Sequence, residues 1–208
     1  MTSDPTYSVA EPTTRVFLDA NVIAKPVTRT LLMAGGPPSG FTTFWSATAE
    51  SEATRHMRRR SVPPSDIRRR FGGTLGPTGA VNGRFNSTAA TDRQILADAD
   101  AGGASFLITE DVDDFDVEDL TSVGISAVTP DLFLASRLSR RAYAMVIALF
   151  VERQVSPPTT PAEFHSAIAR QHLLLFAAHS DLYPIAPMPS PHPPPAVVFR
   201  GPNLVRPD

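Results

Sequence analysis

In the stretch Arg15-Val-Phe-Leu-Asp19, three consecutive apolar residues lead directly to an acid. A continuous apolar run favours a strand that is buried on both faces, as in a parallel sheet. The stretch Ser105-Phe-Leu-Ile-Thr109 has the same character and is followed by Glu110 and Asp111. Ligands of open parallel sheets bind beyond the carboxyl ends of the strands. Both strands are therefore expected to end at a functional site.

Further strands and helices are predicted around these two. Strands are expected at residues 40–45 and 125–128, and helices at 28–34, 46–60, 65–71, 91–101 and from 129 onward. Thr91 and Gln94 have the spacing of a capping box for the fourth of these helices. Residues 72–87, rich in glycine and turn residues, are expected to form a mobile loop. The alternation predicts a three-layer α/β/α domain with a central parallel sheet over residues 15–138.

The C-terminal part has a different composition. Two helices are predicted at residues 141–154 and 161–178, and Thr160 and Glu163 form a capping box for the second. His165, His172 and His179 recur every seven residues, which indicates a packing stripe on that helix, because steps of about 10.5 Å are too long for one metal ion. We expect a flexible N-terminus (1–14), a helical extension (139–182) and an extended or disordered proline-rich tail (183–208).

Composition excludes several classes of protein. The 208 residues include no cysteine, which excludes disulfides, thiolate zinc sites and cysteine nucleophiles. Lys25 is the only lysine, so a P-loop is not expected, and the formal charge of −2 gives no global field that attracts nucleic acid. The longest apolar run, 142–151, is about half of what a membrane span needs. A cytoplasmic protein without a membrane segment is expected.

Four acids are the candidates for chemistry. Asp19 and Asp111 follow the two buried strands, Asp92 lies in the first turn of a predicted helix, and Glu52 lies about two turns into another. Carboxylates that converge on one point repel one another and raise each other's pKa. A Mg²⁺ or Mn²⁺ ion removes this conflict, since hard cations prefer oxygen ligands. Such an ion can activate water and stabilise charge on a phosphoryl group.

These positions also resemble a known family. Val16-Phe-Leu-Asp19-Ala-Asn21 resembles the opening motif of PIN domains, in which the aspartate binds metal. Trp45-Ser46 followed by Glu52 is similar to the second motif. The stretches Asp92-Arg-Gln-Ile-Leu-Ala97 and Gly103-Ala-Ser-Phe-Leu-Ile-Thr109-Glu-Asp111, with Asp114-Phe115, resemble the third and fourth.

The resemblance covers residues 15–135 and carries functional expectations. It implies a magnesium-dependent, single-strand-specific ribonuclease of the VapC-like toxin group, silenced by a cognate antitoxin protein and often forming a homodimer. Its catalytic and metal-binding residues would be Asp19, Glu52, Asp92 and Asp111. The helices after residue 140 resemble an extension found in some members of a bacterial branch.

Several assignments stay open at this stage. Glu50 can replace Glu52, because the two lie about 200° apart on a helix and only one can face Asp19. Asp114 can replace Asp111 or join it. Asn21 and Thr109 are candidates for hydrogen bonds that orient a ligand or a bound water. Asp98 and Asp100 are expected to be solvated or to support the ligands.

The arginines after Glu52 suggest a substrate contact. Arg55, Arg58, Arg59 and Arg60 would form a basic rim that binds the RNA backbone, although a solvated helix face explains them equally well. The alternative function is a non-catalytic PIN-like module that binds nucleic acid or protein. A metal-dependent phosphatase or DNA nuclease on a related scaffold is a third reading.

Overall fold

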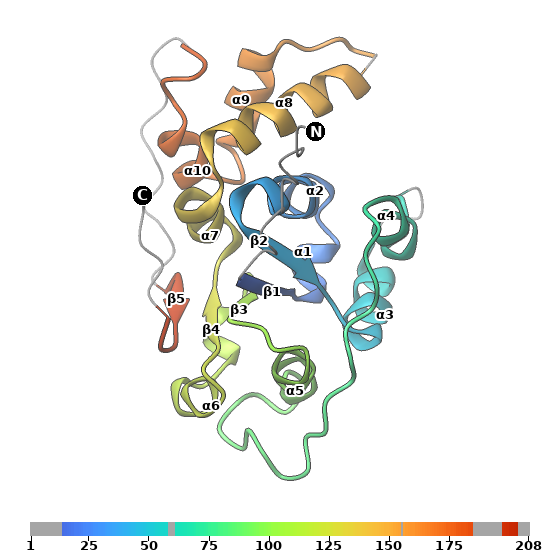
Figure 1. Cartoon of the computed structure of the whole chain (residues 1–208), viewed down its shortest axis with the longest axis vertical. Helices are drawn as coiled ribbons and strands as arrows, with labels where there is room; N and C mark the ends of the chain where they lie inside the picture. The colour runs from blue at the N-terminus through green and yellow to red at the C-terminus, as the bar shows by residue number, and fades with distance from the viewer. Residues whose placement is uncertain (1–13, 58–60, 155, 185–196, 204–208) are drawn as a thin grey trace, which may run out of the picture.

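The computed structural model describes residues 14–57, 61–154, 156–184 and 197–203 of the chain, whose centre is a sheet of five strands in the order β2-β1-β3-β4-β5 (Figure 1). The strands β1 (Thr14–Leu18), β2 (Phe41–Phe44), β3 (Phe106–Ile108) and β4 (Ser126–Val128) pair in parallel. The short β5 (Phe199–Arg200) pairs antiparallel with β4. The predicted α/β class and parallel sheet are confirmed for the first four strands.

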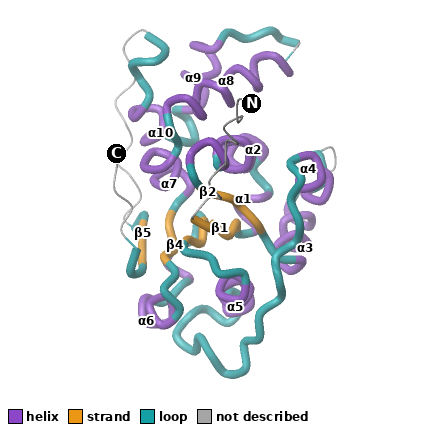
Figure 2. The backbone as a smooth tube through the Cα atoms, viewed as in Figure 1, coloured by secondary structure: helices purple, strands orange, loops and turns teal. Residues whose placement is uncertain are grey.

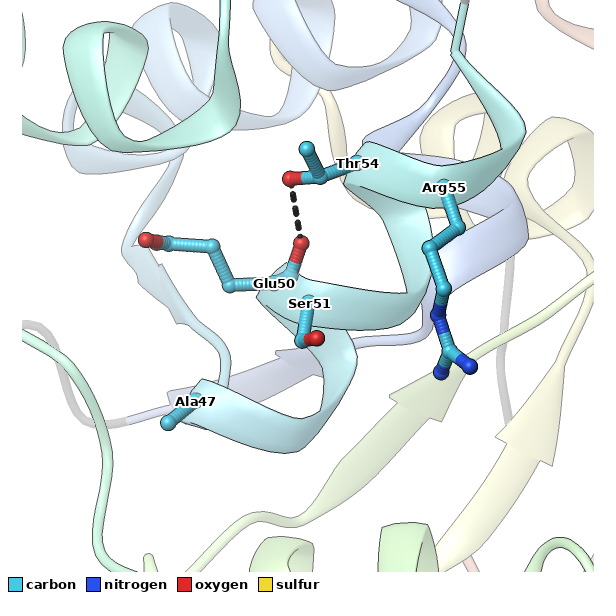
Figure 3. A pocket seen from close by; sticks show the side chains of 5 residues that line it. All are labelled: Ala47, Glu50, Ser51, Thr54 and Arg55. Carbon is cyan, nitrogen blue, oxygen red and sulfur yellow. Dashed lines mark hydrogen bonds between the residues drawn. The ribbon is translucent and has the colours of Figure 1, made fainter.

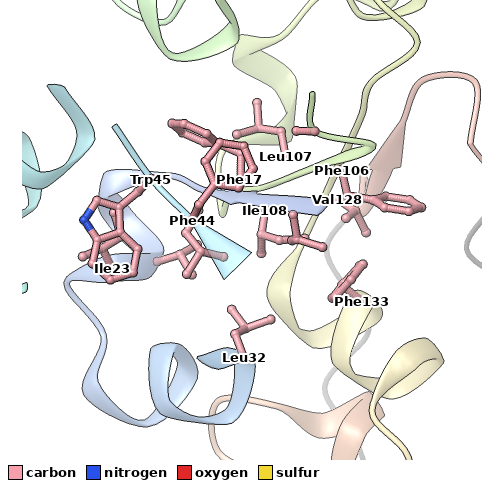
Figure 4. Close-up of a cluster of buried hydrophobic side chains, with 14 of the residues drawn as sticks. Phe17, Ile23, Leu32, Phe44, Trp45, Phe106, Leu107, Ile108, Val128 and Phe133 are labelled. Carbon is pink, nitrogen blue, oxygen red and sulfur yellow. The ribbon is translucent and has the colours of Figure 1, made fainter. Parts of the chain in front are cut away.

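The sheet forms because its central strands have no polar face. Every residue of β3 is buried, as are the last three residues of β1. Phe17 packs edge-on against Phe44 with ring centroids 5.3 Å apart, and Phe106 packs against Phe133 at 5.4 Å (Figure 4). Such aromatic pairs contribute about 0.5–1.5 kcal/mol each beyond the area that they bury.

Helices lie on both sides of the sheet. In Figure 1, α2 (Pro26–Gly35) and α7 (Pro130–Arg137) lie above it, and α5 (Arg93–Ala101) and α6 (Val117–Ser122) lie below. The short α1 (Ala20–Ile23) follows β1, while α3 (Ala47–His56) and α4 (Pro64–Arg70) lie at one end. Two 3₁₀ turns, η1 (Pro37–Ser39) and η2 (Val112–Asp114), complete this part.

The long connection before α5 has no regular structure, as predicted, but it is anchored to the domain (Figure 2). The Gly79 amide donates to Oδ1 of Asp98 at 2.8 Å, and the Gln94 side chain donates to the Gly79 carbonyl at 2.8 Å. A Cβ on Gly79 would lie 1.9 Å from the Ala97 carbonyl oxygen, so only glycine fits there. Asp98 is therefore a buried structural acid, and the expectation that it is solvated is wrong.

The capping box predicted at the start of α5 is also wrong. The helix begins at Arg93, and Asp92 occupies the N-cap position without a capping hydrogen bond. The Thr91 hydroxyl donates to Oδ2 of Asp92 at 2.6 Å instead of accepting from the helix. The Gln94 side chain forms other contacts: its Nε2 donates to the Gly79 carbonyl and to Oδ1 of Asp98.

The C-terminal helices gather beyond α2 and α7 in Figure 1, where α8 (Arg140–Arg153) packs against α2. The single helix predicted over residues 161–178 is wrong, because the chain forms α9 (Pro161–Ile168) and α10 (Leu173–Ala178). The carboxylate of Asp131 accepts hydrogen bonds from the amides of Leu174 and Leu175, which starts a new helix there. The capping box of Thr160 and Glu163 is confirmed.

The three histidines do not form a stripe on one helix, since the helix breaks between them. Their predicted packing role is confirmed, because His165, His172 and His179 are all buried. His165 accepts or donates a 2.6 Å hydrogen bond with the Tyr143 hydroxyl, and His179 stacks on the same tyrosine at 4.3 Å. His172 is 2.9 Å from the Thr28 hydroxyl of α2. The histidines thus join α9 and α10 to the rest of the chain.

Part of the proline-rich tail returns to the sheet. Residues 199–200 form β5, and the Asn203 side chain donates to the carbonyls of Ser105 and Gly124, both at 2.8 Å. The tail was predicted to be extended or disordered; residues 199–200 are extended, but their pairing with β4 was not predicted. Residues 185–196 and 204–208 and the N-terminal 1–13 lie outside the described residues. Within the described ranges, no helix is both long and apolar enough to span a bilayer.

Candidate functional site

A pocket of about 550 Å³ lies beside the carboxyl ends of β1 and β3 and is lined by acids. Its five carboxylates come from separate places in the chain: the end of β1, α3, the residue before α5, and the start and end of the 3₁₀ turn after β3. They are Asp19, Glu52, Asp92, Asp111 and Asp114. The pocket therefore contains the four acids named from the sequence and the acid held as their alternative.

Asp19 is the most buried of these acids, with 6% of its surface exposed. Its amide donates to the Ile108 carbonyl at 3.0 Å, which continues the pairing of β1 with β3. Oδ1 accepts from the Ala20 amide at 2.6 Å, and Oδ2 accepts from the Thr109 hydroxyl at 2.7 Å. Burial is the main cause that raises the pKa of Asp19 from 3.8 to about 6; the two hydrogen bonds oppose this shift, and the charges of Asp92 and Glu52 contribute to it.

Thr109 and Asn21 connect Asp19 to Asp111. The Asn21 side-chain amide donates to Oγ1 of Thr109 and to Oδ2 of Asp111, each at 3.1 Å. The Asp111 amide donates to the same threonine oxygen at 3.1 Å. Hydrogen bonds of this kind fix the orientation of two carboxylates that lie on adjacent segments.

Asp92 and Asp114 complete the other side of the pocket. The Ala89 amide donates to the Asp114 carbonyl at 3.0 Å, which joins the segment before Asp92 to the segment after β3. Burial raises the pKa of both acids, and Asp111 raises each further by repulsion. The five acids of the pocket thus place several negative charges close together, and these charges repel one another.

The two glutamates of α3 have different surroundings. Glu52 lines the acidic pocket, whereas Glu50 accepts hydrogen bonds from Trp45 Nε1 at 2.8 Å and from Arg68 Nε at 3.0 Å. Glu50 lies instead at a shallow depression of about 330 Å³ on α3. Figure 3 shows its side chain and that of Arg55 extending to opposite sides of the helix.

A lysine and a histidine also line the pocket, and sequence reasoning missed both. Lys25 and His56 lie on its lining, and Lys25 Nζ forms an ion pair with Oε1 of Glu110 at 2.7 Å. The sequence signal for Lys25 was its place six residues after Asp19, just past a short helix. Arg55 is exposed and lines the other depression, and Arg58, Arg59 and Arg60 lie outside the described residues.

The donor set suits a hard divalent cation, although the acids are not closed around one point. Among the residues that the structure describes, no three histidine, aspartate or glutamate side chains are placed so as to hold an ion. Burial is the main reason why the pKa values of Asp19, Asp92 and Asp114 are raised, and repulsion between carboxylates without a counter-ion adds to the effect of burial. Five carboxylates with an amide nearby are the ligands that Mg²⁺ and Mn²⁺ prefer. The chemistry therefore fits such an ion once side chains rotate inward.

Comparison with known proteins adds no assignment: the chain matches no protein-family model, no curated protein and no solved structure. Fold and site define an α/β protein with an acidic pocket at the carboxyl ends of its parallel strands. This is the position at which open α/β sheets bind ligands.

Proposed function

We propose that the chain is a metal-dependent ribonuclease with a three-layer PIN-like architecture. The observation that carries the proposal is the gathering of five acids in one pocket, with the pKa of Asp19 raised to about 6. Asp19 is buried and the other four acids are half-buried or exposed beside it, and placing acids together destabilises a protein, so packing gives no reason to assemble them. A cation site does give a reason, because the ion makes the ionised acids favourable.

Asp19, Glu52, Asp92 and Asp111 would hold Mg²⁺ or Mn²⁺, and Asp114 would join Asp111. When bound, such an ion lowers the pKa of a water ligand and stabilises negative charge on a phosphoryl oxygen. Each oxygen of Asp19 already accepts one hydrogen bond, which holds the carboxylate in place and leaves a lone pair on each oxygen free.

Other residues of the pocket would act on the substrate. Lys25 and His56 place positive or neutral donors beside the acids, where a phosphodiester would otherwise be repelled. Asn21 keeps its amide directed at Thr109 and Asp111, so it orients the ligands and not the substrate. The choice of RNA over DNA or a phosphomonoester rests on the resemblance of these segments to PIN domains.

The same resemblance supports the biological setting. We propose a cytoplasmic toxin that cleaves single-stranded RNA, whose acids are covered by a cognate antitoxin, and that forms homodimers. The basic rim of Arg55, Arg58, Arg59 and Arg60 belongs to this proposal as the contact with the RNA backbone.

Cleavage of single-stranded RNA by the purified chain tests the function. We expect cleavage with Mg²⁺ or Mn²⁺, none with EDTA, and a loss of about 10²- to 10³-fold in Asp19→Asn, as for removal of a central electrostatic group. Asp66→Asn, at a half-buried acid that lies outside the pocket and pairs with Arg69, is the matched control. Single-stranded DNA and a phosphomonoester separate this function from a DNA nuclease or phosphatase.

Two other outcomes would contradict the proposed site or the proposed activity. Cleavage that survives in Asp19→Asn contradicts the site. A chain that binds Mn²⁺ and RNA without cutting RNA supports the non-catalytic binding module instead.

A further inference from the structure

A buried arginine contacts two segments of the chain that adjoin residues of the acidic pocket. Arg29 of α2 is 2% exposed, and its guanidinium donates to main-chain carbonyls: Nη1 to Ile23 at 2.9 Å and Nη2 to Val62 at 3.2 Å. Nη1 also lies 3.8 Å from Sδ of Met57. Within the described part of the chain no carboxylate forms an ion pair with it, and burial lowers its pKa.

These contacts join two segments that each carry residues of the pocket lining, one around α1 and one at the end of α3. Ile23 is the last residue of α1, which starts directly after Asp19. Met57 is the C-cap of α3 and follows His56, and Val62 precedes α4. One guanidinium therefore connects the helix that follows Asp19 to the chain that follows the helix of Glu52.

The side-chain packing between α1 and α3 does little by itself to fix the position of α3. The residues of α3 that are buried are Ala49 and Ala53, whose short side chains allow α1 and α3 to approach closely but interlock little. At the N-terminal end of α3, the ion pair between Glu50 and Arg68 restrains the helix. Arg29 supplies the restraint at the C-terminal end, where His56 lies.

We propose that Arg29 is a positioning residue that sets the separation between Asp19 and Glu52. The inference rests on the proposed function, because it assumes that these two acids share an ion. Burying a cation without an anionic partner costs stability, and an apolar side chain of similar volume is often neutral or stabilising at such sites. A guanidinium at this place is explained by the three groups that it holds together, since a planar fork can donate to several carbonyls at once.

The test measures Mn²⁺ binding by calorimetry in the full chain for wild type, Arg29→Met and Arg29→Lys, at a temperature where circular dichroism shows each to be folded. We expect the Mn²⁺ dissociation constant to rise about tenfold in Arg29→Met, in the range seen when groups that orient ligands are removed. The Mn²⁺ dissociation constant of Arg29→Lys, which keeps the charge but loses the planar guanidinium, should lie between those of wild type and Arg29→Met. In RNA cleavage, kcat should fall while KM stays unchanged.

A matched control separates positioning from stability. Leu175→Ala creates a cavity in α10, away from the pocket, and should lower the melting temperature without changing the Mn²⁺ affinity. If Arg29→Met binds Mn²⁺ as tightly as wild type, or if Leu175→Ala loses as much affinity as Arg29→Met, the positioning role of Arg29 is overturned and the metal site is not. A wild-type chain that binds no Mn²⁺ overturns the metal site and this role together.

Discussion

The Thr109 hydroxyl donates a hydrogen bond to Oδ2 of Asp19 across 2.7 Å, from a residue ninety positions away in the chain. The contact follows from strand register, because Leu18 pairs with Ile108 and the next residue of each strand leaves the sheet at the same edge. The same threonine oxygen accepts from the Asn21 side chain and from the Asp111 amide. One buried hydroxyl thus contacts the segments that follow β1 and β3, which carry Asp19 and Asp111.

Thr109→Val should weaken metal binding while the fold is retained. Valine fills the same space but removes the donor to Asp19 and the acceptor for both the Asn21 side chain and the Asp111 amide, so three polar groups lose a partner. The Mn²⁺ dissociation constant should rise about tenfold to a hundredfold, and calorimetry measures it. Thr109→Ser keeps the hydroxyl and is the matched control. Equal affinity in the valine and serine variants would show that the hydroxyl does not orient Asp19.

Asp19→Asn should stabilise the metal-free protein at neutral pH. Burial raises the pKa of Asp19 to about 6 from 3.8, so its contribution to stability is full below pH 3.8 and is lost as pH rises through 6. At 1.36 kcal/mol per pH unit, the ionised group costs about 3 kcal/mol. Asparagine avoids this cost but replaces one acceptor by a donor, so we expect a gain of about 1–3 kcal/mol.

Urea unfolding in EDTA, followed by the fluorescence of the single tryptophan, Trp45, measures this gain at pH 5 and pH 7.5. The difference between wild type and Asp19→Asn should be larger at pH 7.5. Excess Mg²⁺ should reverse the order, because only the wild type gains binding energy. If Asp19→Asn is less stable than wild type at pH 7.5 in EDTA, the ionised Asp19 carboxylate does not destabilise the metal-free protein.

Glu50→Gln and Glu52→Gln should have opposite effects, although the two residues are neighbours on one helix. Glu50 bonds to Trp45 and Arg68, so its neutralisation should lower the free energy of unfolding by about 1–3 kcal/mol and leave Mn²⁺ affinity unchanged. Glu52 lines the acidic pocket, so its neutralisation should reduce Mn²⁺ affinity at least about tenfold without loss of stability. Each variant is the control for the other. A loss of Mn²⁺ affinity in Glu50→Gln but not in Glu52→Gln would show that Glu50, and not Glu52, binds the metal.

The parts of the site that sequence reasoning predicted are those set by local rules. Asp19 and Asp111 were found because parallel strands end at one edge, and Glu50 and Glu52 were separated by helix geometry. Asp98 was misjudged because its partner, Gly79, belongs to a segment with no regular pattern. Lys25 was overlooked as a pocket residue since the turn after α1 depends on packing.

The fold shows the same division. Short apolar runs between helical segments predicted four strands. The fifth strand, β5, comes from a proline-rich tail whose composition indicates no strand. The break between α9 and α10 depends on Asp131, which is more than forty residues away from the amides that it binds. Neither contact has a signal within a short window of sequence.

Lys25→Met and Glu110→Gln should change RNA affinity in opposite directions. Lys25 Nζ pairs with Glu110 at the pocket, where both side chains are partly exposed, so the pair is weak and a phosphate can compete for the lysine. Lys25→Met should weaken RNA binding and reduce the slope of log K against log salt by about 1. Glu110→Gln frees the lysine and should tighten binding severalfold. Fluorescence anisotropy in the Asp19→Asn background measures both, and a weaker complex in Glu110→Gln would place the lysine away from RNA.

The buried histidines should make the C-terminal helices sensitive to acid. Burial is the main reason why the pKa values of His165, His172 and His179 lie below 6.5. Because the unfolded chain binds these protons more readily, their contribution to stability is full above pH 6.5 and is lost as pH falls through the folded pKa values. His172→Gln keeps a partner for Thr28 but cannot be protonated, so it should reduce the loss of unfolding free energy between pH 7.5 and pH 5. Urea unfolding in the Asp19→Asn background removes the opposing effect of that acid, and exposed His56→Gln is the control. If His172→Gln loses as much stability on acidification as its parent, the histidine does not carry this dependence.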